Sequence, residues 1–473
     1  SNEVLETAIK LIEKLDPKIN SIHLKLFDFA KESLKKNKNK FFYGVPIFLK
    51  DLDASLKGFP MMQGSNFLKE NNMSYNSNIT KKIISTGSII CGKSATPEFG
   101  LMVTTEPKAF LPTKNPWDLK CTSGGSSGGS AASVASRMVP IAHANDGGGS
   151  IRIPSASCGT LGLKPTRGRI SCSPMDGDRW SGFSTSGIIS RTVRDTAYMY
   201  NDIFGNAVGD PYYSIYKKGS LVKSLSKKSK FKIGFSTKFQ LPVKVSDETK
   251  KAVIFNANIC ESLGHSVEEI DLKYDSFLLA RAFIIIISSH VSEMIEELKL
   301  LKGRDYKFNE IENSSLVLDY LGREFTGLDY AWARQTVQKI ARDVMIQMDN
   351  YDSVILPILS EPPVLLGSIT PTKLVEVRND LLRFLKLGWL FKWKLTRDRI
   401  LNKLIPQNFW YAPDVLLQNI TGQPALSIPT YWTEKGLPMG VQFVSRFSDE
   451  YTLIDIASQI EEAHPWDHRI PKI

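Results

Sequence analysis

Cysteine is scarce in this chain, whose 473 residues include only five. They are Cys91, Cys121, Cys158, Cys172 and Cys260. An odd number at irregular spacing argues against a disulfide framework, and no Cys and His pattern typical of a metal site accompanies them. We therefore expect no metal site and a reducing compartment, with the cytoplasm as the default location. No secretory signal is visible at the start of the chain, although a signal that has been removed stays open as an alternative.

Long hydrophobic runs are missing as well. The longest, Phe283 to Ile287, is flanked by Arg281 and His290 and is far shorter than the roughly 18 residues that a membrane span needs. Nucleic-acid motifs are also missing, because the net charge is +11 but the lysine-rich stretches lack interleaved aromatic residues. We expect no spanning helix and no nucleic-acid partner, and we attribute the positive charge to solubility.

Two clusters of glycine and serine, at residues 124–130 and 147–150, stand out against these absences. A small-residue helix pattern and a strand-like apolar run lie between them, so the glycines belong to the packed fold rather than to a linker. The clusters lack the glycine spacing of a dinucleotide site, the Gly-Lys-Ser/Thr of a phosphate loop and the Gly-x-Ser-x-Gly of an α/β-hydrolase. Glycine N–H groups followed at once by Ser150 suit a serine nucleophile beside an oxyanion hole.

A serine nucleophile needs a base, and the spacing leaves two candidates open. His143 lies nearest the second cluster at the end of a strand-like run, where a structural imidazole is the ordinary interpretation. Lys50 closes the apolar run Val45 to Leu49, where burial would lower the lysine pKa toward neutrality and make the amine a usable base. A lysine at a strand end can also simply extend its charge into solvent. Lys50 is the better chemical candidate of the two.

Together these segments resemble the amidase signature family. The matching segments are Gly44-Val45-Pro46 leading to Lys50 and residues 124–129, 146–152, 162–169, 421–425 and 436–442. The likeness runs in order over nearly the whole chain and is weakest from Tyr216 to Phe409. The stretches 143–149 and 209–213 are most similar to the stand-alone amidase subgroup that contains 6-aminohexanoate cyclic-dimer hydrolase.

The resemblance implies a Ser-Ser-Lys catalytic set. Lys50 is the expected base, Ser150 the nucleophile, and Ser126 the bridging serine that follows a cis Gly125–Ser126 bond. Neutral Lys50 would take a proton from Ser126, which takes one from Ser150 as its oxygen attacks an amide carbonyl. Water would then hydrolyse the acyl-serine, and no cofactor is implied.

The same resemblance implies supporting roles around the nucleophile. The N–H groups of Gly147, Gly148 and Gly149 would hold the oxyanion. Asp146 would orient these groups or pair with Arg152, although an aspartate beside glycines is also an ordinary turn former.

The expected fold is α/β, with a large mixed central sheet covered by helices on both faces. Helix patterns fit residues 3–15, 22–35, 79–86, 192–204, 246–263 and 450–462. Strand-like runs fit residues 45–49, 88–91, 139–142, 232–235, 353–356 and 441–444. Both ends of the chain belong to one resemblance, so we expect a single domain, 1–473, in which residues 216–409 form a divergent helical cap that sets substrate specificity.

The function we favour is that of a stand-alone amidase, which hydrolyses a carboxylic amide to an acid and ammonia or an amine. The first alternative is the glutaminase component of a tRNA-dependent amidotransferase. It is disfavoured because residues 182–189 depart from the Ser-Leu-Asp-Gln segment typical of that glutaminase. The second is a non-catalytic binding protein on the same fold, which is disfavoured because all three reactive positions are occupied.

Residues 380–403 form one further candidate site. They fit a helix with two tryptophans, a wide apolar arc and a narrow basic strip. The ordinary interpretation is a helix buried between the sheet and another helix. The alternative is that part of the arc caps the active site or rests on an anionic membrane surface, and delivers a hydrophobic acyl amide to Ser150.

Overall fold

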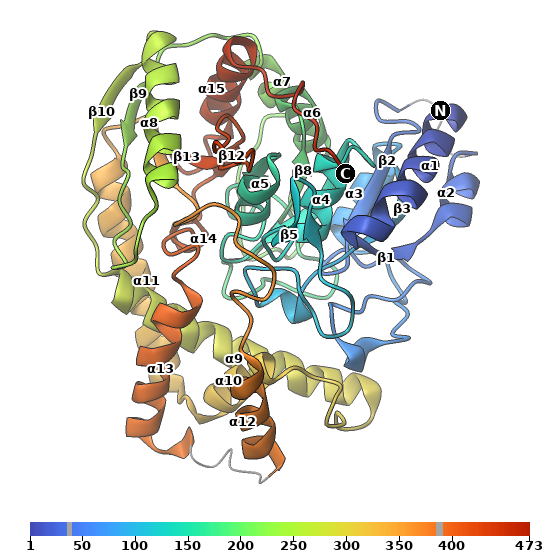
Figure 1. The fold of residues 1–473 in the computed structure, drawn as a ribbon, viewed down its shortest axis with the longest axis vertical. Coiled ribbons are helices and arrows are strands. Elements are labelled where there is room, and N and C mark those ends of the chain that lie inside the picture. The colour runs from blue at the N-terminus through green and yellow to red at the C-terminus, as the bar shows by residue number, and fades with distance from the viewer. Residues whose placement is uncertain (36–39, 385–390) are drawn as a thin grey trace.

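The structure is a computed structural model that describes residues 1–35, 40–384 and 391–473. Its centre is an 11-stranded sheet in the order β1-β3-β2-β6-β8-β7-β12-β13-β11-β9-β10 (Figure 1). Strand β2 pairs in parallel with β3 and β6, whereas β8, β7, β12 and β13 follow one another in antiparallel pairs. The mixed α/β sheet predicted from the sequence is confirmed.

The strands of the central sheet are β1 (Ile22–Lys25), β2 (Pro46–Lys50), β3 (Ile89–Ser94), β6 (Ile141–Asp146), β7 (Leu161–Lys164), β8 (Thr185–Ser190), β9 (Lys232–Phe235), β10 (Ser266–Glu269), β11 (Ser353–Pro357), β12 (Ala425–Ile428) and β13 (Val441–Ser445). A separate two-stranded ribbon is formed by β4 (Lys114–Asn115) and β5 (Asp118–Thr122). All six predicted strands appear in the central sheet, with ends displaced by up to a few residues.

The α-helices are α1 (Asn2–Ile19), α2 (Phe27–Ser33), α3 (Asn78–Ser85), α4 (Gly128–Ala135), α5 (Arg152–Cys158), α6 (Val193–Ile203), α7 (Ser220–Ser224), α8 (Asp247–Ser262), α9 (Ser276–Lys302), α10 (Asn313–Glu324), α11 (Gly327–Met348), α12 (Lys373–Phe384), α13 (Lys394–Asn408), α14 (Leu417–Thr421) and α15 (Glu450–Ala463). Short 3-10 turns lie at Asn66–Leu68 and Glu98–Gly100.

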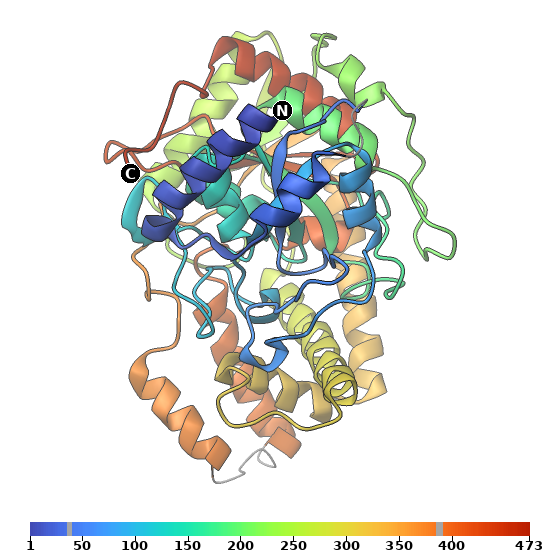
Figure 2. The same ribbon diagram turned by 90° about the vertical axis from the view of Figure 1, so that its right-hand side faces the viewer.

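Helices cover both faces of the sheet, as the alternation along β2 shows. Ile47 and Leu49 belong to the same buried cluster as residues of α3 and α6, whereas Phe48 between them packs in the cluster that contains α1 and α4. Successive side chains of a strand point to opposite faces, so this division places α3 and α6 on one side and α1 and α4 on the other. Figure 2 shows α1 lying across one face of the sheet. Lys50 therefore ends a strand that is buried on both faces.

The middle of the chain contributes both to the sheet and to a helical layer. Strands β9, β10 and β11 lengthen the sheet, so residues 216–409 are not helical throughout. Helices α9, α10, α12 and α13 gather at one end of the molecule, the lower end in Figures 1 and 2. We call α9 to α13, without β11, the helical layer.

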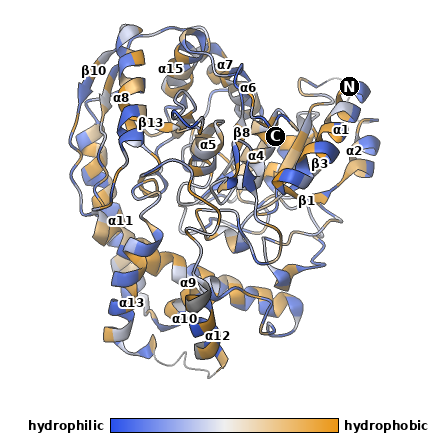
Figure 3. Ribbon diagram, viewed as in Figure 1, coloured by the Kyte–Doolittle hydropathy of each residue, from blue (hydrophilic) through white to orange (hydrophobic). Residues whose placement is uncertain are grey.

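Helix α9 is the apolar spine of this layer, and Figure 3 shows hydrophobic residues along it. By length and composition it could cross a membrane, yet 61% of its most apolar window is buried inside the fold. Ile286, Val291 and Ile295 pack in one cluster with residues of α10 and α11. Its hydrophobicity is therefore satisfied by the protein's own core.

Two helix predictions need correction. Residues 22–35 were predicted as one helix, but β1 (Ile22–Lys25) pairs with the edge of β3 before α2 begins at Phe27. The three residues Ile22, His23 and Leu24 gain ladder hydrogen bonds at an open sheet edge, which local helix periodicity cannot reveal.

The predicted helix at residues 380–403 is likewise not continuous. Helix α12 ends at Phe384, and Trp393 has extended backbone dihedrals before α13 begins at Lys394. Residues 385–390, which include Trp389, lie outside the described part of the chain. The apolar and basic pattern is therefore divided between the end of α12 and the start of α13.

Candidate active site

Lys50 lies at the carboxyl end of β2 and is fully buried. Its Nζ donates to Ser126 Oγ at 2.7 Å and to the side-chain oxygen of Asn145. Burial lowers the Lys50 pKa to about 7, while the nearby carboxylates of Asp53 and Asp146 oppose this shift. The environment that the sequence predicted for this lysine is thus present, and a large part of the population is neutral at physiological pH.

Ser126 follows the predicted cis peptide bond, Gly125–Ser126, just before α4. The backbone at Gly125 passes so close to Thr104 that a side-chain Cβ there would lie 2.6 Å from the Thr104 carbonyl carbon. Thr105 Oγ1 donates to Gly124 O at 2.9 Å and fixes the preceding turn. These contacts explain why the loop is built from glycine and how it holds Ser126 beside Lys50.

Ser150 lies in the turn between β6 and α5 and is half-buried. The backbone N–H of Ser127 donates to Ser150 O at 3.3 Å, so the two serine segments are joined directly. In the described part of the chain the Ser150 hydroxyl makes no hydrogen bond. The structure therefore brings the Lys50–Ser126 pair together with a serine whose hydroxyl has no partner among the described residues.

Asp146 and Arg152 hold the glycine turn before Ser150. Asp146 Oδ1 accepts from Gly149 N at 2.7 Å, and Oδ2 accepts from Ile151 N at 3.1 Å and from Arg152 Nε at 3.0 Å. Both proposed functions of Asp146, orienting an N–H group and pairing with Arg152, are thus combined in one carboxylate. Burial acts to raise the Asp146 pKa, but the Arg152 charge and hydrogen bonds outweigh it and hold that pKa well below its usual range.

The oxyanion donors differ in part from the expectation. Gly149 has a φ of 115°, and its N–H points to Asp146 rather than outward. The N–H groups of Gly147 and Gly148 have no hydrogen-bond acceptor among the residues that the structure describes. Gly149 is therefore engaged in shaping the turn, and two of the three predicted donors are available for a ligand.

The carboxyl-terminal part of the chain clamps Arg152 from the other side. Arg152 is fully buried, and its Nη1 donates to Val415 O at 2.7 Å and to Gln442 Oε1 at 2.8 Å. Asn419 accepts from Arg152 Nη2 at 2.7 Å and donates to Asp146 Oδ1 at 2.8 Å. The nucleophile turn is thus fixed by residues about 270 positions later in the sequence.

Aromatic side chains line the glycine turn. A Cβ at Gly147 would lie 2.7 Å from the Trp180 ring, and one at Gly148 would lie 3.5 Å from the Phe283 ring of α9. Phe283 also packs against Phe183, with ring centroids 6.1 Å apart. The helical layer therefore reaches the site through an aromatic residue.

The arrangement of a buried lysine, two serines and free N–H groups invites comparison with known proteins. A family model described as amidase matches residues 3–454. The chain belongs to the amidase signature family. It is 30% identical to 6-aminohexanoate-cyclic-dimer hydrolase of Paenarthrobacter ureafaciens, over 100% of this chain and 93% of that protein.

Solved structures of amidases agree with the fold. A 6-aminohexanoate cyclic dimer hydrolase complexed with substrate superposes with a TM-score of 0.88 and 29% identity, covering 99% of this chain and 95% of that one. A bacterial aryl acylamidase of the amidase signature family gives a TM-score of 0.83 and 26% identity, over 98% and 93% of the two chains. These relatives establish an amide-hydrolysing enzyme of the stand-alone type that acts on a small-molecule amide.

A more distant structure bears on the glutaminase alternative. The glutaminase (A) component of the glutamyl-tRNA(Gln) amidotransferase from Thermotoga maritima is 22% identical and gives a TM-score of 0.75, over 100% of this chain and 96% of that one. At this identity the likeness shows a shared fold alone.

Sequence reasoning missed three residues that continue the amidase site behind Lys50. Asn145 accepts from Lys50 Nζ and donates to Asp53 Oδ2, and Asp53 pairs with Arg179 at 2.5 Å. Asn145 stands beside Asp146 in the sequence, so its place in the motif was a visible signal. Asp53 and Arg179 lie in loops and carried no such signal.

His143, the other candidate base, does not face the serines. It is fully buried, and its Nδ1 accepts from the Lys50 backbone N–H at 3.3 Å. Burial lowers its pKa to about 3, so the imidazole is neutral. His143 therefore supports β2 as a structural residue, as its ordinary interpretation predicted.

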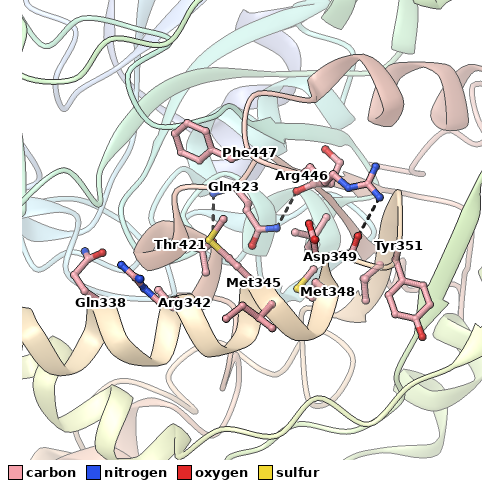
Figure 4. A pocket seen from close by; sticks show the side chains of 15 residues that line it. Gln338, Arg342, Met345, Met348, Asp349, Tyr351, Thr421, Gln423, Arg446 and Phe447 are labelled. Carbon is pink, nitrogen blue, oxygen red and sulfur yellow. Dashed lines mark hydrogen bonds between the residues drawn. The ribbon is translucent and has the colours of Figure 1, made fainter.

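A separate surface hollow of about 660 Å³ lies between the second half of α11 and the ends of α14 and β13 (Figure 4). Gln338, Arg342 and Met345 line one side, and Gln423 and Phe447 line the other. Lys50, Ser126 and Ser150 are not among its lining residues. This hollow is distinct from the catalytic constellation.

Proposed function

We propose that the protein hydrolyses carboxylic amides through an acyl-enzyme on Ser150, with Ser126 as the proton relay and Lys50 as the base. The observation that carries this proposal is the 2.7 Å contact between the fully buried Lys50 Nζ and Ser126 Oγ. A buried lysine with a lowered pKa accepts a proton near neutral pH, which an exposed lysine does not.

In the acylation step, Ser150 Oγ bonds to the carbonyl carbon while its proton passes to Ser126 and the Ser126 proton passes to Lys50. The C–N bond then breaks as Lys50 returns its proton through Ser126 to the leaving nitrogen, which departs as ammonia or an amine. Water attacks the acyl-serine by the same relay and releases the carboxylic acid. Every proton taken by Lys50 is returned within each half-reaction.

The N–H groups of Gly147 and Gly148 form the oxyanion hole in this proposal. Their freedom from acceptors among the described residues supports the assignment, because donors aimed at the developing charge need no reorganisation. Each such donor typically contributes about 3 kcal/mol to lowering the barrier. Asp146 and Arg152 position the turn that presents them, and Gly149 passes that restraint to the backbone.

We infer a hydrophobic acyl amide as the substrate class. Trp180 and Phe283 line the glycine turn, and an apolar acyl chain would be desolvated against them. The chain is proposed to act as one domain, with α9 to α13 as the cap that sets specificity. The reach of α9 to Gly148 supports that role.

The ends of α12 and α13 are proposed to contact an anionic membrane surface. Phe384 is 75% exposed, Trp393 62% and Leu395 72%, so large apolar side chains project from this tip rather than into the core. Lys392 and Lys394 flank Trp393 and would meet anionic headgroups. The proposal replaces the buried-helix interpretation only for these described residues.

A fluorophosphonate labelling reaction followed by peptide mass spectrometry tests the function. The expected result is a label on Ser150, since the reagent requires an activated serine. An amide panel with short and long acyl chains and with glutamine then defines the substrate. A label on another residue, or none, would overturn the assignment, and a strong preference for glutamine would favour the glutaminase alternative.

A further inference from the structure

We propose that Asn145, Asp53 and Arg179 are positioning residues that aim the Lys50 amine at Ser126 and keep it able to accept a proton. This inference rests on the proposed role of Lys50 as the base. It concerns residues outside the Ser-Ser-Lys set, two of which come from loops far apart in the sequence.

The three residues form a continuous chain behind Lys50. Lys50 Nζ donates to the side-chain oxygen of Asn145, whose Nδ2 donates to Asp53 Oδ2. Asp53 Oδ1 lies 2.5 Å from Arg179 Nη1, and Arg179 also pairs with Asp176. Asn145 and Asp53 are buried, whereas the Arg179 side chain is 22% exposed. The chain thus runs from the catalytic amine to the edge of the protein.

The orientation of the Asn145 amide follows from its neighbours. Ionised Asp53 can only accept hydrogen bonds, so it takes the NH₂ group of Asn145 and turns the amide oxygen toward Lys50. A neutral amine has two hydrogens and one lone pair. When one hydrogen is given to Asn145, the lone pair is free to face Ser126 Oγ at 2.7 Å, which is the geometry that a proton acceptor requires.

The same chain controls the charge around Lys50. The acidic side chains that act on the amine are those of Asp53 and Asp146, and each is paired with an arginine, Arg179 and Arg152 respectively. Because the partner in direct contact is a neutral amide rather than a carboxylate, the negative charge of Asp53 is held one residue away. Both features limit the stabilisation of the ammonium form.

The remaining ionisable neighbours do not alter this balance. His143 accepts from the Lys50 backbone and is neutral. Asp51, next in the sequence, is itself held by His23 at 2.9 Å and Lys93 at 3.4 Å, so its charge is compensated locally. Asp53 and its arginine are therefore the adjustable part of the field at Lys50.

The test is the pH dependence of fluorophosphonate labelling of Ser150, which needs no knowledge of the natural substrate. In Arg179→Gln, Asp53 loses its cation, so the ammonium form is stabilised and the acid limb should move to higher pH by about 1 unit. In Asn145→Asp a carboxylate touches the amine, and the limb should move further in the same direction, with labelling recovering at alkaline pH. Arg191→Gln is the control, since Arg191 is 23% exposed, pairs with Asp467 and lies beyond the opposite end of β8.

The outcomes separate this inference from the proposed function. If the wild-type label is not on Ser150, the proposed function itself fails. If Ser150 is labelled but both variants label more slowly by the same factor at every pH, with the limb unmoved, the chain is merely structural and the inference is overturned. Should Asn145→Asp fail to fold, the limb of Arg179→Gln alone decides, because Arg179 lies at the partly exposed end of the chain.

Discussion

The turn around Ser150 and the helical layer of α9 to α13 are built by different physical means. Around Ser150 the decisive side chains are polar and buried, and Asp146 and Arg152 each satisfy several partners. In the helical layer the spine is apolar, and its distal helices leave Phe384 and Trp393 largely exposed. Hydrogen bonds fix positions to fractions of an ångström, whereas apolar packing tolerates substitution of similar volume. Chemistry should therefore fail sharply in the first region and change gradually in the second.

The largest effect is expected for Ser150→Ala, which removes the nucleophile and no packing. Amide hydrolysis should fall by roughly 10⁴ to 10⁶-fold, with the thermal unfolding midpoint unchanged. Lys50→Ala and Ser126→Ala should also be severely impaired, although Lys50 is buried and its variant needs a folding check. Wild-type turnover by Ser150→Ala would show that another residue carries the reaction.

Asp146→Ala sharpens the comparison on stability. It leaves Arg152 buried without its carboxylate, and the free energy of unfolding should fall by about 3 to 5 kcal/mol. The matched change in the helical layer is Asp398→Ala, which unpairs the partly exposed Arg281 and should cost less than about 1 kcal/mol. Denaturant unfolding of both variants measures the contrast, and equal losses would contradict it.

The pH dependence separates Lys50 from a second buried lysine. Lys50 acts only when neutral, so kcat/KM should fall about tenfold per unit as the pH drops below about 7 and should level off above it. Burial also lowers the Lys164 pKa to about 7, but its Nζ donates to Pro165 O at 2.8 Å rather than to a serine. The limb should therefore persist in Lys164→Met, and its disappearance there would assign it to the wrong lysine.

A smaller effect is expected from Phe283→Leu in α9. The shorter side chain leaves space beside Gly148, so the ratio of kcat/KM for long and short acyl amides should change by roughly tenfold. Stability should drop by less than about 1.5 kcal/mol. Leu298→Met, about four turns along the same helix, is the control and should leave the ratio unchanged. An unchanged ratio in Phe283→Leu would remove α9 from substrate selection.

The smallest effect on the folded enzyme is expected from Trp393→Ala and Phe384→Ala. Both side chains are mostly exposed, so stability should change by less than about 0.5 kcal/mol and hydrolysis of a soluble amide should be unaffected. Co-sedimentation with anionic liposomes should decrease, whereas Ile215→Ala, at another exposed apolar position, should retain it. Wild-type protein that does not sediment with liposomes would exclude the membrane contact.

The sequence was informative where chemistry and local spacing act together. The glycines at 124–125 and 147–149 mark places where the backbone passes too close for side chains, and the lysine after an apolar run marks a buried amine. These requirements are local, so the cis bond, the Lys50–Ser126 pair and the buried environment of Lys50 could be predicted. The expected mixed sheet follows from alternating patterns of the same local kind.

The remainder depends on contacts between distant segments. No pattern near Asp53 indicates that Arg179 will reach it, and nothing near Arg152 indicates Gln442 or Asn419. The strand at Ile22–Lys25 forms because β3 offers an open edge, and the helix pattern around it is overridden. The role of Gly149 as an internal donor likewise follows from the Asp146 side-chain rotamer rather than from residue type.

The order of the strands has a consequence for how the protein is made. Lys50, Ser126 and Ser150 leave the ribosome within the first third of synthesis, yet β12 and β13 occupy the middle of the sheet and emerge last. A nascent chain therefore carries every reactive group long before Asn419 and Gln442 can lock the nucleophile turn. Such long-range closure slows folding and leaves the gap between β7 and β11 open until release, a period when chaperone binding would protect the unpaired edges. Catalytic competence is thus the last property that the growing chain acquires.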